Sequence, residues 1–369
     1  MEQSDTTIDR LPRWDESPSH VAAGPVRVEE LAADRHGEWD AYIAEAPNAT
    51  FFHRSGWMRA VRDLYGHRAR YYVARESGSD RVCGVLPLFA VSGPLTGRAL
   101  ISIPYAVGGG VAADDSDIEA QLVDRARQEA DQLQVRYLEL RQEPLGEHLT
   151  VRDHYFAFRA AMPNDPEQVL GRFPRKARAE IRKARDQFGL TARFGHDLLE
   201  TFYDLYVRSL RRLGSPGHSW RFLSRLVKEF GDDCIVEVIY HEGNPVAGVM
   251  SFRFRDQILP YYAGIDDRYN RLNTSNYLYF ALMEHAVGLG LRVFDFGRTR
   301  RDNIGGCQFK TNQGFEPEPM LYSFYSPRGA ELPDLRPSNA AFSRTQDLWR
   351  RLPLSVAGPL GGVVSRWLP

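Results

Sequence analysis

The feature of this chain that most constrains its fold is an internal repeat. Residues 82–89 read Val-Cys-Gly-Val-Leu-Pro-Leu-Phe, and residues 246–252 read Val-Ala-Gly-Val-Met-Ser-Phe. Further along, the string Arg-Tyr-Leu-Glu-Leu at 136–140 is repeated as Arg-Val-Phe-Asp-Phe at 292–296. Both strings recur in the same order at an offset of about 160 residues, as expected of a duplicated domain. The duplication predicts that the glycine and the acidic residue of each copy lie at equivalent positions: Gly84 with Gly248, and Glu139 with Asp295.

Length and local composition agree with two domains. The chain has 369 residues, and a domain usually takes about 100 to 200. Residues 1–25 lack hydrophobic periodicity and are expected to form a disordered tail. A Pro/Asn/Asp cluster near residue 163 breaks the periodicity again. We therefore expect a first domain at 26–162, a second domain at 163–326 and a C-terminal extension at 327–369.

Strand and helix patterns alternate in both halves, which predicts a mixed α/β fold. In the first half we expect helices at 30–46, 57–65 and 116–134, with Ser116 as the cap of the last, and strands at 69–74, 82–91, 99–105 and 135–140. In the second half we expect helices at 175–188, 198–213, 220–230 and 276–288, and strands at 235–240, 246–255, 258–264 and 293–296.

Charge and motif content exclude several classes of function. The formal net charge is -1, so no global positive field indicates a nucleic-acid partner. The three cysteines are widely spaced, which supports neither a disulfide framework nor a zinc ribbon, and no metal site is expected. His-Glu-x-x-His, Walker and Gly-x-Ser-x-Gly motifs do not occur. The start of the chain is polar and acidic, unlike a secretory signal, so we expect a cytoplasmic protein.

A set of short motifs near residue 300 resembles the FemAB family of acyltransferases. It comprises Phe-Asp-Phe-Gly-Arg at 294–298, Phe309-Lys310, and Gly-Phe-Glu-Pro at 314–317. Upstream, the resemblance includes the basic segment 178–184 and extends over most of residues 26–325. It implies two N-acetyltransferase-like (GNAT) domains, that is, tandem duplicated GNAT-like domains of mixed α/β class.

The resemblance is greatest to FemAB-like proteins associated with exosortase and PEP-CTERM surface systems. That subgroup has Gly-Thr-Pro where this chain has Gly-Ser-Pro at 214–216. The family resemblance implies transfer of an acyl or aminoacyl group to an amine of a cell-wall or exopolysaccharide precursor. It implies no permanently bound cofactor, and it leaves the donor open between aminoacyl-tRNA and acyl-CoA.

Acyl transfer passes through a tetrahedral intermediate and needs a positive group at the developing oxyanion. Lys310 fits this need at the family's Phe-Lys motif, although an isolated lysine usually lies on the surface. Asp295 is placed either to orient an amine or to pair with Arg298. Tyr262 is placed to hold the acceptor or relay a proton, and the alternative is a packed core tyrosine.

Five residues make up the predicted substrate-binding set. Arg212 is expected to contact a diphosphate by its family position. Ser275 and Asn276 open a helix, whose free N–H groups either bind an anion or are simply capped. Arg298 and Phe309 complete the set as members of the motifs. Cys307 is expected to be an ordinary cysteine in a loop before Phe309.

Two further segments suggest partners. The helix at 172–186 carries seven basic and two acidic residues, so it is either a solvated face or a contact for tRNA. The C-terminal tail from residue 338 combines leucines, two tryptophans and arginines, so it either packs on the second domain or touches a membrane surface peripherally. The segment 266–274 lacks the Gly-rich loop of acyl-CoA-dependent GNAT enzymes, which places aminoacyl-tRNA slightly ahead as donor. Two rivals are an acyl-CoA-dependent N-acyltransferase and a non-enzymatic protein that binds or assembles surface polysaccharide.

Overall fold

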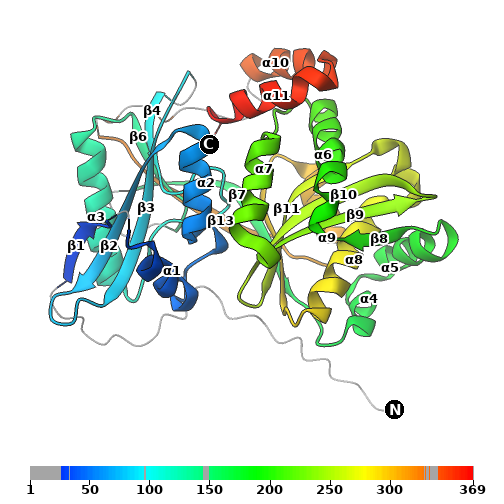
Figure 1. Cartoon of the computed structure of the whole chain (residues 1–369), viewed down its shortest axis with the longest axis horizontal. Helices are drawn as coiled ribbons and strands as arrows, with labels where there is room; N and C mark the ends of the chain where they lie inside the picture. The colour runs from blue at the N-terminus through cyan, green and yellow to red at the C-terminus, as the bar shows by residue number, and fades with distance from the viewer. Residues whose placement is uncertain are drawn as a thin grey trace.

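A computed structural model describes residues 26–32, 34–94, 97–143, 149–327, 329, 332 and 340–368. The tail expected over residues 1–25 lies outside this part of the chain. The described strands form one continuous sheet in the order β1-β2-β3-β4-β6-β13-β7-β12-β11-β10-β9-β8, and β5 pairs with β3 at the side. The mixed α/β class predicted from the sequence is confirmed, and Figure 1 shows the sheet running through both halves of the molecule.

The first half of the molecule holds the strands β1 to β7. Its elements are β1 (Val26–Glu30), α1 (His36–Glu45), α2 (Ser55–Tyr65), β2 (Arg68–Glu76), β3 (Val82–Gly93), β4 (Gly97–Ile101), β5 (Ala112–Ala113), α3 (Ser116–Gln132), β6 (Tyr137–Leu140) and β7 (Thr150–Ala161). The helix expected at 30–46 is replaced by β1 and the shorter α1. Helix α3 is capped by the Asp115 carboxylate rather than by Ser116, because that carboxylate accepts from two backbone N–H groups of the first turn.

The second half repeats this order. Its elements are α4 (Val169–Arg172), α5 (Arg175–Arg182), β8 (Thr191–Phe194), α6 (Leu199–Leu213), α7 (Trp220–Phe230), β9 (Cys234–His241), β10 (Asn244–Phe254), β11 (Gln257–Ile265), α8 (Thr274–Gly288), β12 (Val293–Arg300), α9 (Ile304–Asn312) and β13 (Glu318–Tyr325). A π-helical turn at 183–187 extends α5. Helices α10 (Ala340–Arg351) and α11 (Leu354–Ser365) follow.

The two halves exchange their last strands. Strand β13 of the second half pairs with β6 of the first, and β7 of the first half pairs with β12 of the second. The exchanged strands also pair with each other, which joins the halves into one sheet. The sequence patterns did not reveal β7 or β13, so this exchange was not predicted.

Two ion pairs between α2 and α7 show the internal symmetry. The Arg59 side chain lies 2.6 Å from Glu229, and Arg225 lies 2.9 Å from Asp63. Each pair joins an arginine of one helix to an acidic residue of the other, so the two contacts are reciprocal. Aromatic packing in the same interface, such as Phe51 stacked on Phe252 at 4.5 Å, places the largest buried cluster between the halves.

The repeat holds for strands but not for every residue. Gly84 and Gly248 lie on β3 and β10, the equivalent central strands of their antiparallel sheets. A Cβ on Gly84 would meet Ile118 of α3, whereas a Cβ on Gly248 would meet Phe202 of α6. Helix α3 packs on the face of the sheet away from the interface between the halves, and α6 packs on the face toward it. The Cα–H groups of the two glycines therefore face opposite sides of the sheet. Matching the two strings identified the equivalent strands correctly. The alignment was wrong by one residue, which exchanges the two faces of the strand.

Candidate functional site

The candidate site is built around a β-bulge in β12. The pairing of Asp295 with Arg159 is followed by that of Arg298 with Ala157, so β12 has one residue more than β7 at this point. Gly297 takes a φ of +64°, which a glycine adopts without steric cost. The bulge takes the carbonyl of Phe296 out of the regular strand pairing.

Lys310 lies on α9 and reaches this carbonyl. Its Nζ donates a hydrogen bond to the Phe296 oxygen at 2.9 Å. The ammonium also lies 5.2 Å from the ring centres of Phe158 and Phe296. Burial among these groups lowers the pKa of Lys310 to about 8, and the charge of Asp295 opposes that shift. Lys310 is therefore a cation close to losing its proton near neutral pH.

Asp295 is held differently from its counterpart in the first half. Its carboxylate accepts the N–H of Gly297 at 2.7 Å, and burial raises its pKa, with Arg159 and Lys310 opposing the rise. In the first half, Glu139 instead pairs with the buried Arg141 at 2.8 Å. No such arginine side chain lies at the bulge, because Gly297 occupies that place. In the second half the carboxylate is therefore held by the Gly297 N–H, and the charges of Arg159 and Lys310 act on it.

The start of α8 joins this centre to α5. Asn276 donates to the Glu180 carboxylate at 2.6 Å and accepts from Gln313 at 3.3 Å. Gln313 follows α9, the helix that carries Lys310. The N–H groups of Asn276 and Tyr277 are bonded to the Asn273 carbonyl, and no side chain within the described part of the chain caps this helix start. Ser275 is half-buried beside it, and Phe309 packs 5.8 Å from the ring of Tyr279.

Three of the predicted residues lie away from Lys310. Tyr262 is buried on the inner face of the sheet, with its ring 5.2 Å from His218. Arg212 is exposed at the end of α6, 3.5 Å from Asp267. Arg298 donates to the Tyr322 hydroxyl at 2.6 Å rather than pairing with Asp295. The structure brings together Lys310, Asp295, Asn276 and Phe309, and their roles stay predictions.

A segment of the first half is bonded to β11 and β13 near the point where β11 and β12 diverge. These parallel strands pair only at 257–258 with 293–294. Beyond that point, the carbonyls of Tyr105, Ala106 and Val107 accept hydrogen bonds from Tyr261, Arg141 and Tyr322. Segment 105–107 is therefore fixed against a side chain of β11 and a side chain of β13.

Some contributors to the site carried no signal in the sequence. Phe158 and Arg159 come from β7, whose residues 150–161 were not assigned as a strand. Glu180 was counted only as a charge that offsets the basic helix. The predicted loop around Cys307 is wrong, because Cys307 and Phe309 both belong to α9. The thiol of Cys307 lies against the Arg300 carbonyl at 3.5 Å, as an ordinary cysteine would.

Comparison with known proteins supports the assignment of the second half. Residues 171–311 match the family model described as acetyltransferase (GNAT) domain. A crystal structure of FemX is 14% identical, with a TM-score of 0.62, over 80% of this chain and 96% of that one. This chain has the tandem GNAT fold.

Two further solved structures share this tandem GNAT arrangement at similar distance. One is a tandem GNAT protein from the clavulanic acid biosynthesis pathway, 13% identical with a TM-score of 0.50, over 82% of this chain and 99% of that one. The other is the C-terminal domain of a putative lysylphosphatidylglycerol synthetase from Agrobacterium fabrum, 13% identical with a TM-score of 0.53, over 81% and 94%. No curated protein sequence matches the chain. The match to the GNAT domain ends at residue 311, so it includes Lys310.

Proposed function

We propose that this protein transfers an acyl or aminoacyl group to an amine, and that the second half carries the reaction. The observation that supports this most is the half-buried Lys310 at the β12 bulge of a GNAT fold, within electrostatic reach of the buried Asp295 carboxylate. The amine nitrogen attacks the acyl carbon, and the oxygen gains negative charge that the ammonium stabilises. Collapse breaks the ester or thioester bond and releases the donor's alcohol or thiol, which takes up a proton.

Asp295 is the group proposed to orient the amine. Because burial raises the pKa of its carboxyl, the carboxylate accepts a proton more readily than an exposed aspartate. It therefore serves both to hold the amine by a hydrogen bond and to receive the proton lost during attack. The Lys310 charge lies within electrostatic reach of Asp295, so the two groups influence each other's protonation.

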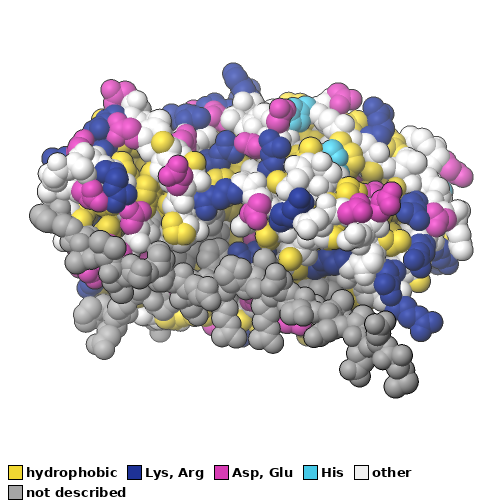
Figure 2. Space-filling view, turned by 90° about the horizontal axis from the view of Figure 1, so that it is seen from below, with side chains coloured by type: hydrophobic (Ala, Val, Ile, Leu, Met, Phe, Trp, Pro, Cys, Tyr) yellow, Lys and Arg dark blue, Asp and Glu magenta, His cyan; other side chains and the backbone are white. Residues whose placement is uncertain are grey.

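Aminoacyl-tRNA is the donor that the surface favours. Helix α5 exposes Arg175, Lys176 and Arg182, and the following turn exposes Lys183. Lys and Arg side chains gather at the end of the molecule where α4 and α5 lie (Figure 2). Glu180 of α5 bonds to Asn276, which bonds in turn to Gln313 beside the reaction centre. A polyphosphate backbone on α5 would thus place its acyl end near Lys310.

The usual route for acyl-CoA has less support. The loop between β11 and α8 carries Asp266 and Asp267, which repel phosphate, and Asp266 holds Arg268 at 2.6 Å. The segment 105–107 is bonded to β11 and β13 near the point where β11 and β12 diverge. Against this, the description of the matched domain names acetyl transfer, so acyl-CoA stays the second candidate. The acceptor class, a cell-envelope precursor, and the association with exosortase systems stay predictions of the sequence.

Binding of the two donors tests this proposal. We expect charged tRNA to bind with an affinity that falls steeply with salt, and acyl-CoA to bind weakly in isothermal titration. Changing Arg182 and Lys183 to Gln should reduce the slope of log K against log salt by about 1 to 2. The matched control changes Arg68 and Arg98, exposed arginines of the first half, to Gln and should leave the slope unchanged. Tight CoA binding with no tRNA binding would select the second candidate.

The pH dependence of kcat tests the charge on Lys310. The ammonium must be protonated to stabilise an oxyanion, and the pKa of Lys310 lies at about 8. Activity at saturating substrate is therefore expected to fall about tenfold per pH unit above pH 8. Because arginine stays charged, Lys310→Arg should remove this falling limb even if kcat is lower. A falling limb that persists unchanged in Lys310→Arg would show that it does not arise from loss of the Lys310 charge.

A further inference from the structure

Helix α11 buries its small residues and exposes its large apolar ones, which is the reverse of an ordinary surface helix. Its small residues Ala357, Gly358 and Gly361 are buried against the rest of the protein, while Val356, Leu360 and Val363 are 42%, 38% and 52% exposed. An ordinary surface helix buries its large apolar side chains. Within the described residues no helix is long and apolar enough to cross a membrane.

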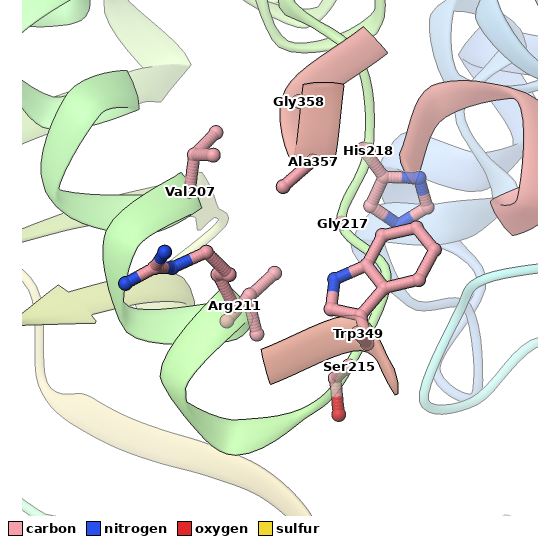
Figure 3. A pocket seen from close by; sticks show the side chains of 9 residues that line it. Val207, Arg211, Ser215, Gly217, His218, Trp349, Ala357 and Gly358 are labelled. Atoms are coloured by element: carbon pink, nitrogen blue, oxygen red, sulfur yellow. The ribbon is translucent and has the colours of Figure 1, made fainter. Parts of the chain in front are cut away.

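The packed face of α11 explains why only small residues fit there. A Cβ on Gly361 would lie 2.8 Å from the Gly217 carbonyl oxygen, and the Ser365 hydroxyl donates to that same oxygen at 2.9 Å. Figure 3 shows Ala357 and Gly358 on one side of a small pocket, with Val207 and Arg211 of α6 on the other. This close approach fixes the rotation of α11, so its large apolar side chains face outward.

The position and charge of this surface narrow the choice of partner. Helices α10 and α11 lie at one edge of the molecule, above α6 and α7 (Figure 1). Residues 352–365 contain no charged side chain, and exposed Arg351 and Arg366 lie just before and just after them. The segment 340–368 carries four arginines and one aspartate. Exposed Leu348 on α10 extends the apolar surface.

We propose that α11 docks flat on a membrane that contains anionic lipids. The apolar side chains of α11 enter the boundary between headgroups and acyl chains, and Arg351 and Arg366 contact lipid phosphates. The Trp349 ring lines the pocket against the protein, so leucines and valines make the apolar contact. A second copy of the chain is less suited, since a two-fold contact would set these arginines against their own copies.

Flotation with vesicles tests this proposal on the full chain. We expect the protein to float with phosphatidylcholine vesicles containing about 30% phosphatidylglycerol, and not with phosphatidylcholine alone. Changing Leu360 and Val363 together to Asp should weaken binding at least about tenfold, because charged side chains would have to enter the interface. Changing Arg351 and Arg366 to Gln should weaken it and reduce its dependence on salt. The matched control is Leu289→Asp, a similarly exposed leucine after α8, which should bind as the wild type does.

Several results would overturn the proposal. Equal flotation of the Leu360→Asp/Val363→Asp variant would remove α11 as the contact. Equal binding to neutral vesicles would remove the role of the arginines. A dimer in analytical ultracentrifugation that this variant abolishes, without vesicle binding, would assign the surface to a second copy. The proposal does not depend on acyl transfer, because activity on soluble substrates should be unchanged in the variant.

Discussion

Lys310→Ala is expected to lower kcat for acyl transfer by about 100-fold or more. The loss follows because the ammonium at the β12 bulge is the group placed to meet negative charge on the tetrahedral intermediate, and loss of one such donor costs about this factor in other enzymes. The measurement is steady-state kinetics with the donor selected by the binding experiments. KM should change much less than kcat, because the charge develops after substrate binding.

Stability measurements separate this effect from unfolding. Keeping Lys310 charged in its half-buried place costs free energy, which offsets the stabilisation from its contacts. Removing the side chain should therefore leave the melting temperature nearly unchanged. Lys310→Met, which keeps the apolar stem, should lose activity to the same extent. The matched control is Lys228→Ala on the exposed side of α7, which should keep full activity. A decrease of tenfold or less in Lys310→Ala would make this lysine a peripheral binding residue.

Gly264→Ala is expected to destabilise the fold by about 3 kcal/mol. Gly264 lies on β11 directly against the backbone of α6, and a Cβ there would lie 2.3 Å from the Tyr206 nitrogen. Backbone atoms of a helix cannot move aside as the end of a side chain can, so α6 or β11 must shift. Urea unfolding followed by circular dichroism measures the change in the free energy of unfolding.

The control for this substitution is Gly288→Ala at the end of α8. No atom outside its own helix lies within 4 Å of the Cβ position, so alanine should leave stability unchanged or raise it by up to about 1 kcal/mol. A cost below about 1 kcal/mol for Gly264→Ala would show that α6 and β11 can separate easily. The site would then lie beside a more deformable sheet than the structure indicates.

The fold was largely predictable because its signals are local. Apolar periodicity located α2, α3, α6 and α7 within a few residues, and the paired strings identified the duplication. The misses have physical causes. Strand β7 was not recognised because residues 150–161 are mostly half-exposed and their polar and apolar residues do not alternate. Helix α9 was taken as a loop because its two adjacent glycines lower helix propensity.

The candidate site was predictable only in part. Lys310, Phe309 and Asp295 were selected through a family motif, and the structure places them near one another. Tyr262 was selected for the cleft, yet its hydroxyl is buried on the inner face with no hydrogen-bond partner among the described residues. Alternation along a strand predicts that Tyr261 and Tyr262 face opposite sides. The pairing of β10 with β11 skips Tyr261, so this bulge breaks the alternation, and the two rings lie 4.8 Å apart at the same buried cluster.

The sequence by itself determined the α/β order of elements, the two copies and the identity of the charged residues near residue 300. The order of elements follows from periodicity, the two copies from the repeated strings, and the charged residues from the motifs that resemble a known family. The tertiary structure alone decided the exchange of β7 and β13 and the outward rotation of α11. Each of these depends on contacts between residues far apart in the chain, such as Gly361 against Gly217, and local patterns hold no information about which distant backbone comes close.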